Sequence, residues 1–328
     1  MGEHITPNVY YQILNQYQAA QLLFEAIKLD IFSHLDSPTT AMEIANKTGY
    51  DEKNIELLLL ALSSCSYIDK VNNSYCNTKT GQEYLSKKSP HYIGHTILFR
   101  ETMTSLSDIG NKVIHGSEKQ LGIGYDFATL AEVTVPEMYA TGRVENFVTE
   151  IKTIFTDTTR QYKILDLGGG SGILAIEFVK NFPNSQAYVF EFPDVAVTTK
   201  KIITKHNMGQ SVSTLAGDFN TDDIGDSYDM IIASGILDFA TDDLEGFMAK
   251  ISEALLEDGY LLLIGRYSET EGYTQDNILA WLSGYMNGIK PPPTRSRVET
   301  ALKKAQLQIV CSIESGRFQG YLYKKVMV

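Results

Sequence analysis

The chain has 328 residues, 43% of them hydrophobic, and a formal net charge of −12. This length predicts about two domains, and the apolar share excludes a disordered chain. The negative charge argues against a nucleic-acid partner, because phosphates would be repelled over most of the surface. No stretch approaches the roughly 20 apolar residues of a membrane span, so we expect a cytoplasmic protein without a membrane partner.

The N-terminal part of the chain has a pattern of helices followed by a hairpin. Residues 10–35 carry apolar side chains at helical spacing. Two further helices are predicted by a capping-box pair, a terminating glycine and a capping aspartate. These four residues are Thr40, Glu43, Gly49 and Asp51. Two short strands then flank Asn72, so three helices and a two-stranded wing predict a winged-helix domain over residues 1–100.

The segment that follows is predicted to be helical rather than extended. Residues 91–117 form one long helical pattern that ends at Gly116, and a glycine-rich loop follows. Residues 127–156 are again helical by pattern, with Pro136 as a start or a kink. We therefore expect residues 101–156 to form a helical linker.

From residue 162 onward, short buried-strand patterns alternate with helical patterns. The strand patterns are YKILDL, QAYVFEF, SVSTLAGDF, YDMIIAS and GYLLLIGRY. This alternation predicts an α/β fold with a Rossmann-like, doubly wound parallel sheet over residues 157–328. The last two segments, LQIVCSIES and GYLYKKV, predict a terminal antiparallel hairpin.

A glycine-rich turn, DLGGGSG, follows the first of these strands. Its glycines allow a tight turn and leave room for a ligand at a helix N-terminus. Asp166, directly before the glycines, suits a ligand with an amino group and a sulfonium rather than a pyrophosphate dianion. With glycines alternating from Gly168 and Gly170, this favours S-adenosylmethionine (SAM) as the cofactor.

Polar and aromatic residues also occur at the ends of the next strands. Glu191 ends the second strand, where a carboxylate can accept both ribose hydroxyls. After the third strand, Asp218 can accept from the adenine amino group while Phe219 packs on its ring. Ser234 ends the fourth strand. Because open α/β sheets bind ligands at the carboxyl ends of their strands, these residues predict one cofactor site.

With these motifs, the chain resembles the dimeric, plant-type O-methyltransferases and their bacterial secondary-metabolism relatives. The resemblance rests on AAQLLFEAIKLDIFSHL and TTAMEIANKTG near the N-terminus, and on ILDLGGGSGILAIEF, EFPDV, AGDF and RSRVETALKKAQL later. It implies SAM-dependent methyl transfer, most often to oxygen, on a small aromatic or conjugated acceptor. It also implies a homodimer built by residues 1–100, with residues 101–156 covering the acceptor pocket.

The resemblance further implies which side chains surround the acceptor. These are His95, Met138, Tyr139, Met286 and Asn287. His91 and His95 are four residues apart on a predicted helix, a spacing that can bind a metal. No further ligand motif accompanies them, and we expect no metal.

The chain departs from the family at the catalytic base. The family usually carries LHDW after its fourth strand, with the His as base, often oriented by a Glu at the end of the fifth strand. Here Asp238 stands at the His position, and Gly265 or Arg266 stands at the Glu position. Asp238 either accepts the proton, with a pKa raised by burial, or orients an acceptor that is already nucleophilic. We favour the second role, and a third interpretation makes Asp238 the flank of the next helix.

Two other classes of function compete with methyl transfer. The first is a SAM-binding relative that performs rearrangement, decarboxylation or hydroxylation, and formation of S-adenosylhomocysteine (SAH) on turnover separates it from a methyltransferase. The second is a non-enzymatic winged-helix DNA binder. Its recognition helix would be NIELLLLALSSCSY, which has no Lys or Arg to contact phosphates or guanines.

Overall fold

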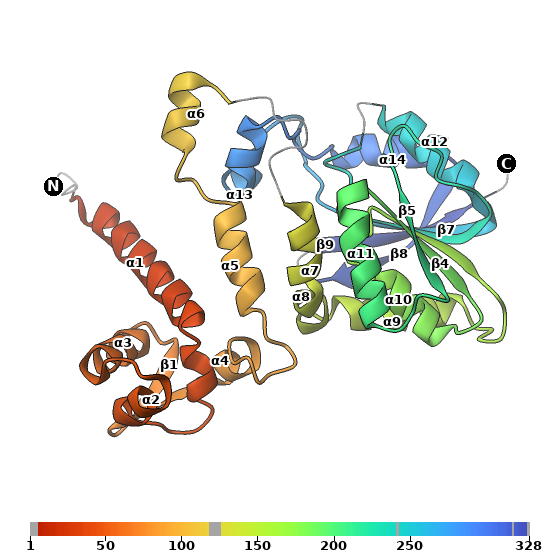
Figure 1. Ribbon diagram of the computed structural model, residues 1–328. Helices are drawn as coiled ribbons and strands as arrows, with labels where there is room; N and C mark the ends of the chain where they lie inside the picture. Colours follow the sequence, from red (N-terminus) through yellow and green to blue (C-terminus); the bar gives the residue numbers. More distant parts are fainter. Residues whose placement is uncertain (1–5, 118–125, 241–242, 317, 327–328) are drawn as a thin grey trace. The chain divides into compact units, whose positions relative to one another are not determined.

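The computed structural model describes residues 6–117, 126–240, 243–316 and 318–326. The chain divides into two compact units, residues 1–100 and residues 101–328 (Figure 1). No helix of the described part of the chain is both long and apolar enough to cross a membrane.

The N-terminal unit consists of helices and one two-stranded antiparallel sheet. Its elements are α1 (Asn8–Lys28), the 3-10 helix η1 (Ile31–His34), α2 (Ala41–Thr48), α3 (Glu52–Ser64), β1 (Ile68–Val71), β2 (Ser74–Asn77), α4 (Lys79–Tyr84) and α5 (Gly94–Met103), whose end passes into the second unit. The predicted capping box is present, since the Thr40 hydroxyl and the Glu43 carboxylate each accept from the other's backbone amide. The hairpin turns at Asn72, as predicted.

Two long helices predicted from apolar periodicity are interrupted. Residues 10–35 are not one helix, because α1 ends at Lys28 and Asp30 adopts a left-handed conformation with a φ of 57°. Asp tolerates this region better than most residues, and its carboxylate accepts from the Ser33 hydroxyl at 2.6 Å. Residues 91–117 are likewise interrupted after α5, where the Ser105 hydroxyl accepts from the Ser107 amide in place of a helical bond.

The second unit alternates helices and strands. Its elements are α6 (Ile109–His115), α7 (Phe127–Val133), α8 (Val135–Ala140), α9 (Arg143–Ile154), β3 (Lys163–Leu167), α10 (Ile173–Asn181), β4 (Gln186–Glu191), α11 (Pro193–Lys205), β5 (Val212–Ala216), β6 (Tyr228–Ser234), α12 (Leu244–Ala254), β7 (Leu255–Gly265), α13 (Gln275–Met286), α14 (Arg295–Lys304), β8 (Leu307–Ser315) and β9 (Phe318–Lys325). Residues 127–156 therefore form three helices, and Pro136 begins the second of them rather than kinking one.

The sheet of this unit has the strand order β5-β4-β3-β6-β7-β9-β8. The strands β3 to β7 run parallel, and β9 is antiparallel to both β7 and β8. Alternate strand residues face opposite sides: Ile164 packs with α9, α10 and α11, whereas Leu165 packs with α12 and α14 (Figure 1). This confirms the predicted α/β fold with its terminal antiparallel hairpin.

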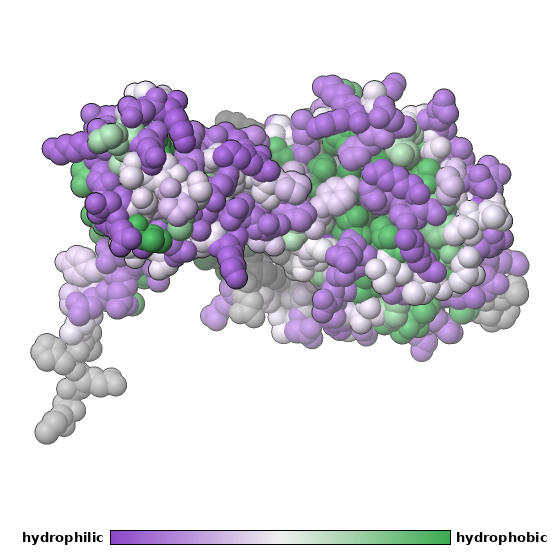
Figure 2. All heavy atoms as spheres, turned by 90° about the horizontal axis from the view of Figure 1, so that it is seen from below, coloured by the Kyte–Doolittle hydropathy of each residue, from purple (hydrophilic) through white to green (hydrophobic). Residues whose placement is uncertain are grey.

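The outermost strand of the hairpin, β8, is irregular. Its register with β9 shifts between Ile309 and Cys311, which marks a bulge. Ile309 and its neighbour Val310 are exposed by 60% and 53%. On the face of the molecule shown in Figure 2, hydrophilic residues predominate and apolar residues form smaller groups between them.

Candidate cofactor and acceptor site

The glycine-rich turn connects the end of β3 to the start of α10. Gly168 and Gly170 have φ values of 65° and 55°, a backbone conformation that residues other than glycine rarely adopt. A Cβ atom added at Gly168 would lie 2.3 Å from Cγ2 of Ile236, so the turn has no room for a side chain there. The turn thus packs against the loop after β6, and its Gly168 and Gly170 amides donate to the Phe190 carbonyl and the Glu191 carboxylate at the end of β4.

Glu191, at the end of β4, is bonded to this turn. One carboxylate oxygen accepts from the Gly170 amide at 2.8 Å, and the other accepts from the Phe192 amide at 3.0 Å. Burial raises the pKa of Glu191, and these two amides act against that increase. The structure therefore places Glu191 beside the glycine turn, and each carboxylate oxygen retains a lone pair for a further donor.

Asp166 lies on the same edge of the sheet and is only 1% exposed. Its Oδ1 atom has no hydrogen-bond partner among the described residues. Burial raises its pKa to about 7, the Arg143 guanidinium lowers it, and the Glu191 carboxylate adds to the increase. A buried carboxylate oxygen without a partner is rare in native proteins and points to a polar ligand at this position.

Arg143, the first residue of α9, is a member of this cluster that the sequence did not indicate. Its guanidinium donates to the Ser234 hydroxyl at the end of β6 and interacts electrostatically with Asp166. Its Nε atom has no hydrogen-bond partner among the described residues, and burial lowers its pKa. Arginines in helices are ordinarily exposed, so only the contact between α9 and the end of β6 reveals this partly buried cation.

The residues after β5 are partly engaged in the protein's own structure. Asp218 is half-buried, and its Oδ1 atom accepts from the Asn220 amide at 2.9 Å, which stabilises a turn. Phe219 is 3% exposed and packs against Phe247, with 5.7 Å between the ring centroids. The Asn220 side chain also donates to the Phe239 carbonyl at 3.1 Å, which ties this turn to the loop after β6.

Asp238 lies in the loop after β6, at the position of the family's catalytic His. Its Oδ2 atom accepts from the Arg266 guanidinium, and its Oδ1 atom has no partner among the described residues. Burial raises the pKa of Asp238, and Arg266 acts against that increase. The following helix is capped by Asp243, which accepts from the Gly246 amide at 2.8 Å. The interpretation of Asp238 as the flank of that helix is therefore wrong.

Arg266 is the first residue after β7, and of the two candidates for the family's Glu position it is the one that contacts Asp238. Its guanidinium carbon lies 4.6 Å from the centroid of the Trp281 ring. Trp281 interrupts α13 with a non-helical φ of −129°. The buried hydroxyl of Tyr285, one helical turn further on, lies beside Arg266 and has no acceptor for its proton among the described residues. An ion pair and aromatic side chains thus replace the family's His–Glu pair.

The predicted acceptor-lining residues are distributed unevenly. Met138 lies beside the glycine turn, because its sulfur accepts from the Ser171 hydroxyl at 3.6 Å. Tyr139 is directed elsewhere, since its hydroxyl donates to Glu177 of α10 at 2.8 Å. Met286 and Asn287 are half-buried at the C-terminal end of α13.

The histidine pair lies in the N-terminal unit. His95 is exposed on α5 and contacts the Tyr92 ring edge-on, with 5.2 Å between centroids. His91 bonds to Glu83 through its ring nitrogen. The two histidines therefore have separate partners, and the described residues contain no group of three or more side chains that could hold a metal.

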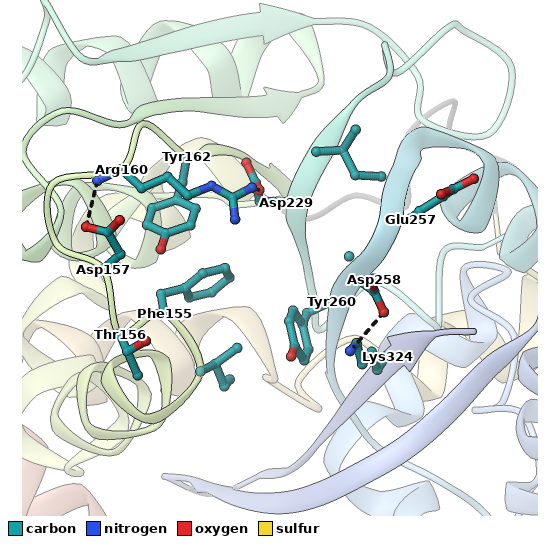
Figure 3. A pocket seen from close by; sticks show the side chains of 13 residues that line it. Phe155, Thr156, Asp157, Arg160, Tyr162, Asp229, Glu257, Asp258, Tyr260 and Lys324 are labelled. Carbon is teal, nitrogen blue, oxygen red and sulfur yellow. Dashed lines mark hydrogen bonds and ion pairs between the residues drawn. The ribbon is translucent and has the colours of Figure 1, made fainter. Parts of the chain in front are cut away.

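A cavity of about 380 Å³ opens at the opposite, amino edge of the sheet (Figure 3). Phe155, Tyr162 and Tyr260 contribute aromatic rings to it, and it contains none of the predicted site residues. Its charged side chains largely pair with one another, as in the Lys324–Asp258 ion pair at 2.9 Å. The predicted site therefore lies at the other end of the strands, where the glycine turn is found.

Comparison with known proteins identifies the family. Residues 111–287 match the O-methyltransferase domain, and residues 11–87 match the O-methyltransferase dimerisation domain. The first match covers more than half of the chain, so the chain belongs to the O-methyltransferase family. This confirms the family predicted from the sequence motifs and, with it, the predicted class of SAM-dependent methyltransferases.

Individual relatives are distant. Uncharacterized protein MJ0086 of Methanocaldococcus jannaschii is 29% identical over 234 residues, which cover 69% of this chain but only 62% of that protein. The 3-hydroxy-5-methyl-1-naphthoate 3-O-methyltransferase of Streptomyces sahachiroi is 24% identical, with coverage of 74% and 72%. Human N-acetylserotonin methyltransferase, solved with SAM, has a TM-score of 0.71 at 20% identity and full coverage of both chains. This last similarity concerns the fold.

Proposed function

We propose that this protein transfers a methyl group from SAM to a small aromatic or conjugated acceptor, with oxygen as the methylated atom. The observation that carries the proposal is the cluster of Asp166, Glu191 and Arg143 around a glycine turn that has no room for a side chain at Gly168. Family membership supports the reaction type, and the naphthoate methyltransferase of Streptomyces sahachiroi supports an aromatic acceptor.

The cluster matches the charges of SAM. The methionine part of SAM carries an ammonium and a carboxylate, and the site offers an unpartnered Asp166 oxygen and a partly buried Arg143 cation. Glu191 has lone pairs left for the ribose hydroxyls, and Phe219 lies behind the glycine turn with Asp218 beside it. A pyrophosphate group would place two negative charges next to Asp166 and Glu191, which disfavours a dinucleotide.

The chain's own contribution to the reaction is orientation. When bound, SAM supplies an electrophilic methyl group, so that the acceptor atom bonds to carbon while the carbon–sulfur bond breaks and leaves its electron pair on sulfur. The glycine turn, Arg143 and Ser234 fix one side of the site, and the Asp238–Arg266 pair fixes the other. Holding reactants in line supplies several kcal/mol of catalysis without a general base.

The test of this proposal is the affinity for SAM. Glu191→Ala should weaken SAM binding by about 1.5–3 kcal/mol, the range for loss of charge-assisted hydrogen bonds. Titration calorimetry measures the affinity, and Glu253→Ala, at an exposed position of α12, is the matched control. An unchanged affinity in Glu191→Ala would contradict the assignment.

A homodimer is part of the same proposal. The first half of α1 exposes a series of large apolar side chains, each by half of its surface or more. They are Val9, Tyr10, Tyr11, Ile13, Leu14 and Tyr17. Apolar surface of this extent on one helix indicates a protein interface, and it overlaps the match to the dimerisation domain. Light scattering that shows a monomer at micromolar concentration would refute the dimer.

One observation favours a second candidate function. The His–Glu pair of the family is replaced by the Asp238–Arg266 ion pair, which fits a relative that binds SAM but performs rearrangement, decarboxylation or hydroxylation. Chromatographic detection of SAH during turnover separates the two functions. A methyltransferase forms one SAH for each product, whereas the alternative forms none.

A further inference from the structure

The acceptor side of the site contains two buried oxygen atoms without partners close to one fixed cation. Asp238 Oδ1 has no hydrogen-bond partner among the described residues. The Tyr285 hydroxyl lies close enough to Arg266 for that guanidinium to lower its pKa, but its own proton has no acceptor among them. Buried polar groups of native proteins are nearly always paired. Two unpaired atoms around one guanidinium therefore indicate that a ligand supplies the missing partners.

Arg266 is held in a fixed orientation. One of its amino groups donates to Asp238, and its guanidinium carbon lies over the Trp281 ring, 4.6 Å from the centroid. Only one of its five N–H donors is used by this ion pair, so others remain for a ligand. A guanidinium fixed by an ion pair and an aromatic ring is ordered before any ligand binds, which reduces the entropic cost of binding.

This group of side chains lies at the same edge of the sheet as the glycine turn. Ser234 of β6 pairs with Ile264 of β7, so the segments containing Asp238 and Arg266 both leave the sheet at its carboxyl edge. The loop that carries Asp238 also touches the turn, because Ile236 occupies the space next to Gly168. An acceptor bound by this group would therefore lie beside the cofactor.

The ion pair makes Asp238 a poor general base. Arg266 opposes the rise in the pKa of Asp238 that burial causes, and protonation of the carboxylate would leave the guanidinium without its counterion. Trp281 and Tyr285 interact with this pair, and neither is a general base near neutral pH. An acceptor at this position must therefore arrive without the proton that a base would remove.

We propose that Asp238, Arg266 and Tyr285 bind the acceptor as a monoanion in which a phenolate or enolate oxygen lies beside an intact hydroxyl group. The inference rests on the proposed function and specifies its substrate class. The anionic oxygen accepts from Arg266 and from the Tyr285 hydroxyl, and it is the atom that becomes methylated. The neighbouring hydroxyl donates to Asp238 Oδ1, so every unpartnered atom of the group gains a partner.

Two requirements follow for the acceptor. A neutral compound leaves Arg266 and Tyr285 without an acceptor, and a compound without the second hydroxyl leaves Asp238 Oδ1 unpaired. Each omission should weaken binding about tenfold, as expected when one buried polar group stays unsatisfied. Acceptors of low pKa are favoured because they are ionised at neutral pH.

The experiment uses the full-length protein saturated with SAH and the probe 4-nitrocatechol, whose phenolate has a distinct visible absorption. We expect the probe to bind as its monoanion, with an apparent pKa lowered by about one unit or more. It should bind about tenfold more tightly than 2-methoxy-4-nitrophenol, which lacks the second hydroxyl, and tighter still than neutral 4-nitroanisole. Equal affinities, binding of the neutral phenol, or no binding of the probe would overturn the proposal.

Variants assign the effect to these side chains. Tyr285→Phe should weaken binding of the probe about tenfold and reduce its spectral shift, whereas Tyr260→Phe, on β7 at the opposite edge of the sheet, should change neither. Arg266→Lys keeps the charge but loses the planar fork, and it should bind the probe less tightly while still binding SAH. An unchanged probe affinity in both Tyr285→Phe and Arg266→Lys would overturn the proposal.

Calorimetry of SAH binding alone distinguishes a failure of the acceptor inference from a failure of the proposed function. If SAH binds but the probe shows no preference for the monoanion, the acceptor inference is wrong and the proposed function stands. If SAH does not bind the wild-type protein, the proposed function fails and the acceptor inference fails with it.

Discussion

Two aspartates at the carboxyl edge of the sheet, Asp166 and Asp238, each have an arginine nearby. Only Asp238 forms an ion pair with its arginine. Arg143 donates to Ser234 and leaves Asp166 with an unpartnered oxygen, and the pKa of Asp166 rises to about 7. Arg266 donates directly to Asp238 and stacks on Trp281. The same two residue types therefore give an open carboxylate on the cofactor side and a fixed ion pair on the acceptor side.

The difference shows that the choice of hydrogen-bond partner decides what a buried carboxylate can do. Asp166 is available to a cationic ligand because its nearest cation is engaged elsewhere. At Asp238, the ion pair with Arg266 opposes the rise in pKa that burial causes and so disfavours proton transfer. Four experiments test this contrast.

The largest expected effect is on stability. Arg266→Met leaves the Asp238 carboxylate buried without its counterion, so the free energy of unfolding should fall by about 2–3 kcal/mol, somewhat less than for a fully buried pair. Urea denaturation measures it. The control is Lys304→Met, whose lysine pairs with Glu245 at side chains that are 61% and 53% exposed and should contribute less than about 1 kcal/mol. Equal losses in the two variants would show that Asp238 is not a buried ion.

The second experiment replaces the arginine on the cofactor side and measures SAM binding. Arg143→Met removes the cation assigned to the SAM carboxylate, and SAM affinity should fall by about 10- to 100-fold, as for a lost charge-assisted hydrogen bond. Titration calorimetry gives the affinity, and Arg266→Lys, on the acceptor side, should retain it. If Arg143→Met binds SAM normally, Arg143 belongs only to the structural network around Ser234.

The third experiment tests Asp238 in turnover once an acceptor is known. Asp238→Asn can still accept from Arg266, so the turnover number should fall by less than about 100-fold, below the upper range for deletion of a general base. SAM affinity measured on the same variant checks that the cofactor site is intact. A loss of 1000-fold or more with normal SAM binding would instead identify Asp238 as the base.

The smallest effect is a pH dependence of SAM binding. Asp166 keeps its proton up to a pH of about 7 in the free protein, and a cationic amino group favours its ionised form. SAM affinity should therefore fall as the pH drops below about 7, by at most tenfold per pH unit, with release of a proton on binding. Calorimetry in buffers of different ionisation enthalpy detects this proton. Asp166→Asn should bind more weakly and with a flatter profile, and an unchanged profile would exclude Asp166.

The fold and one half of the site were predictable because they rest on local patterns. The strands of the second unit alternate with helices along the chain, and the glycine turn with Glu191 marks the carboxyl edge of the sheet. The break at Asp30 was not predictable, because the apolar periodicity continues across a residue that leaves the helical conformation. Periodicity reports which face is buried and not whether the helix is continuous.

Arg143 was missed, and Arg266 was named only as one of two residues at the family's Glu position, for a different reason. Arg143 meets Ser234 from 91 positions away, and Arg266 meets Asp238 across two neighbouring strands. No local pattern distinguishes these two arginines from the exposed ones. The loss of the family's His was visible in the sequence, but the compensating ion pair follows only from the register of β6 and β7.

The bulge in β8 has a consequence for the behaviour of the protein at high concentration. β8 is an edge strand, and its outer row of amides and carbonyls could join the edge of a second molecule. Exposed Ile309 and Val310 would favour such an encounter, but the bulge beside them disrupts the regular spacing that a new strand needs. The irregular register thus protects against aggregation. A deletion that straightened β8 would leave an edge strand able to pair with the edge of a second molecule.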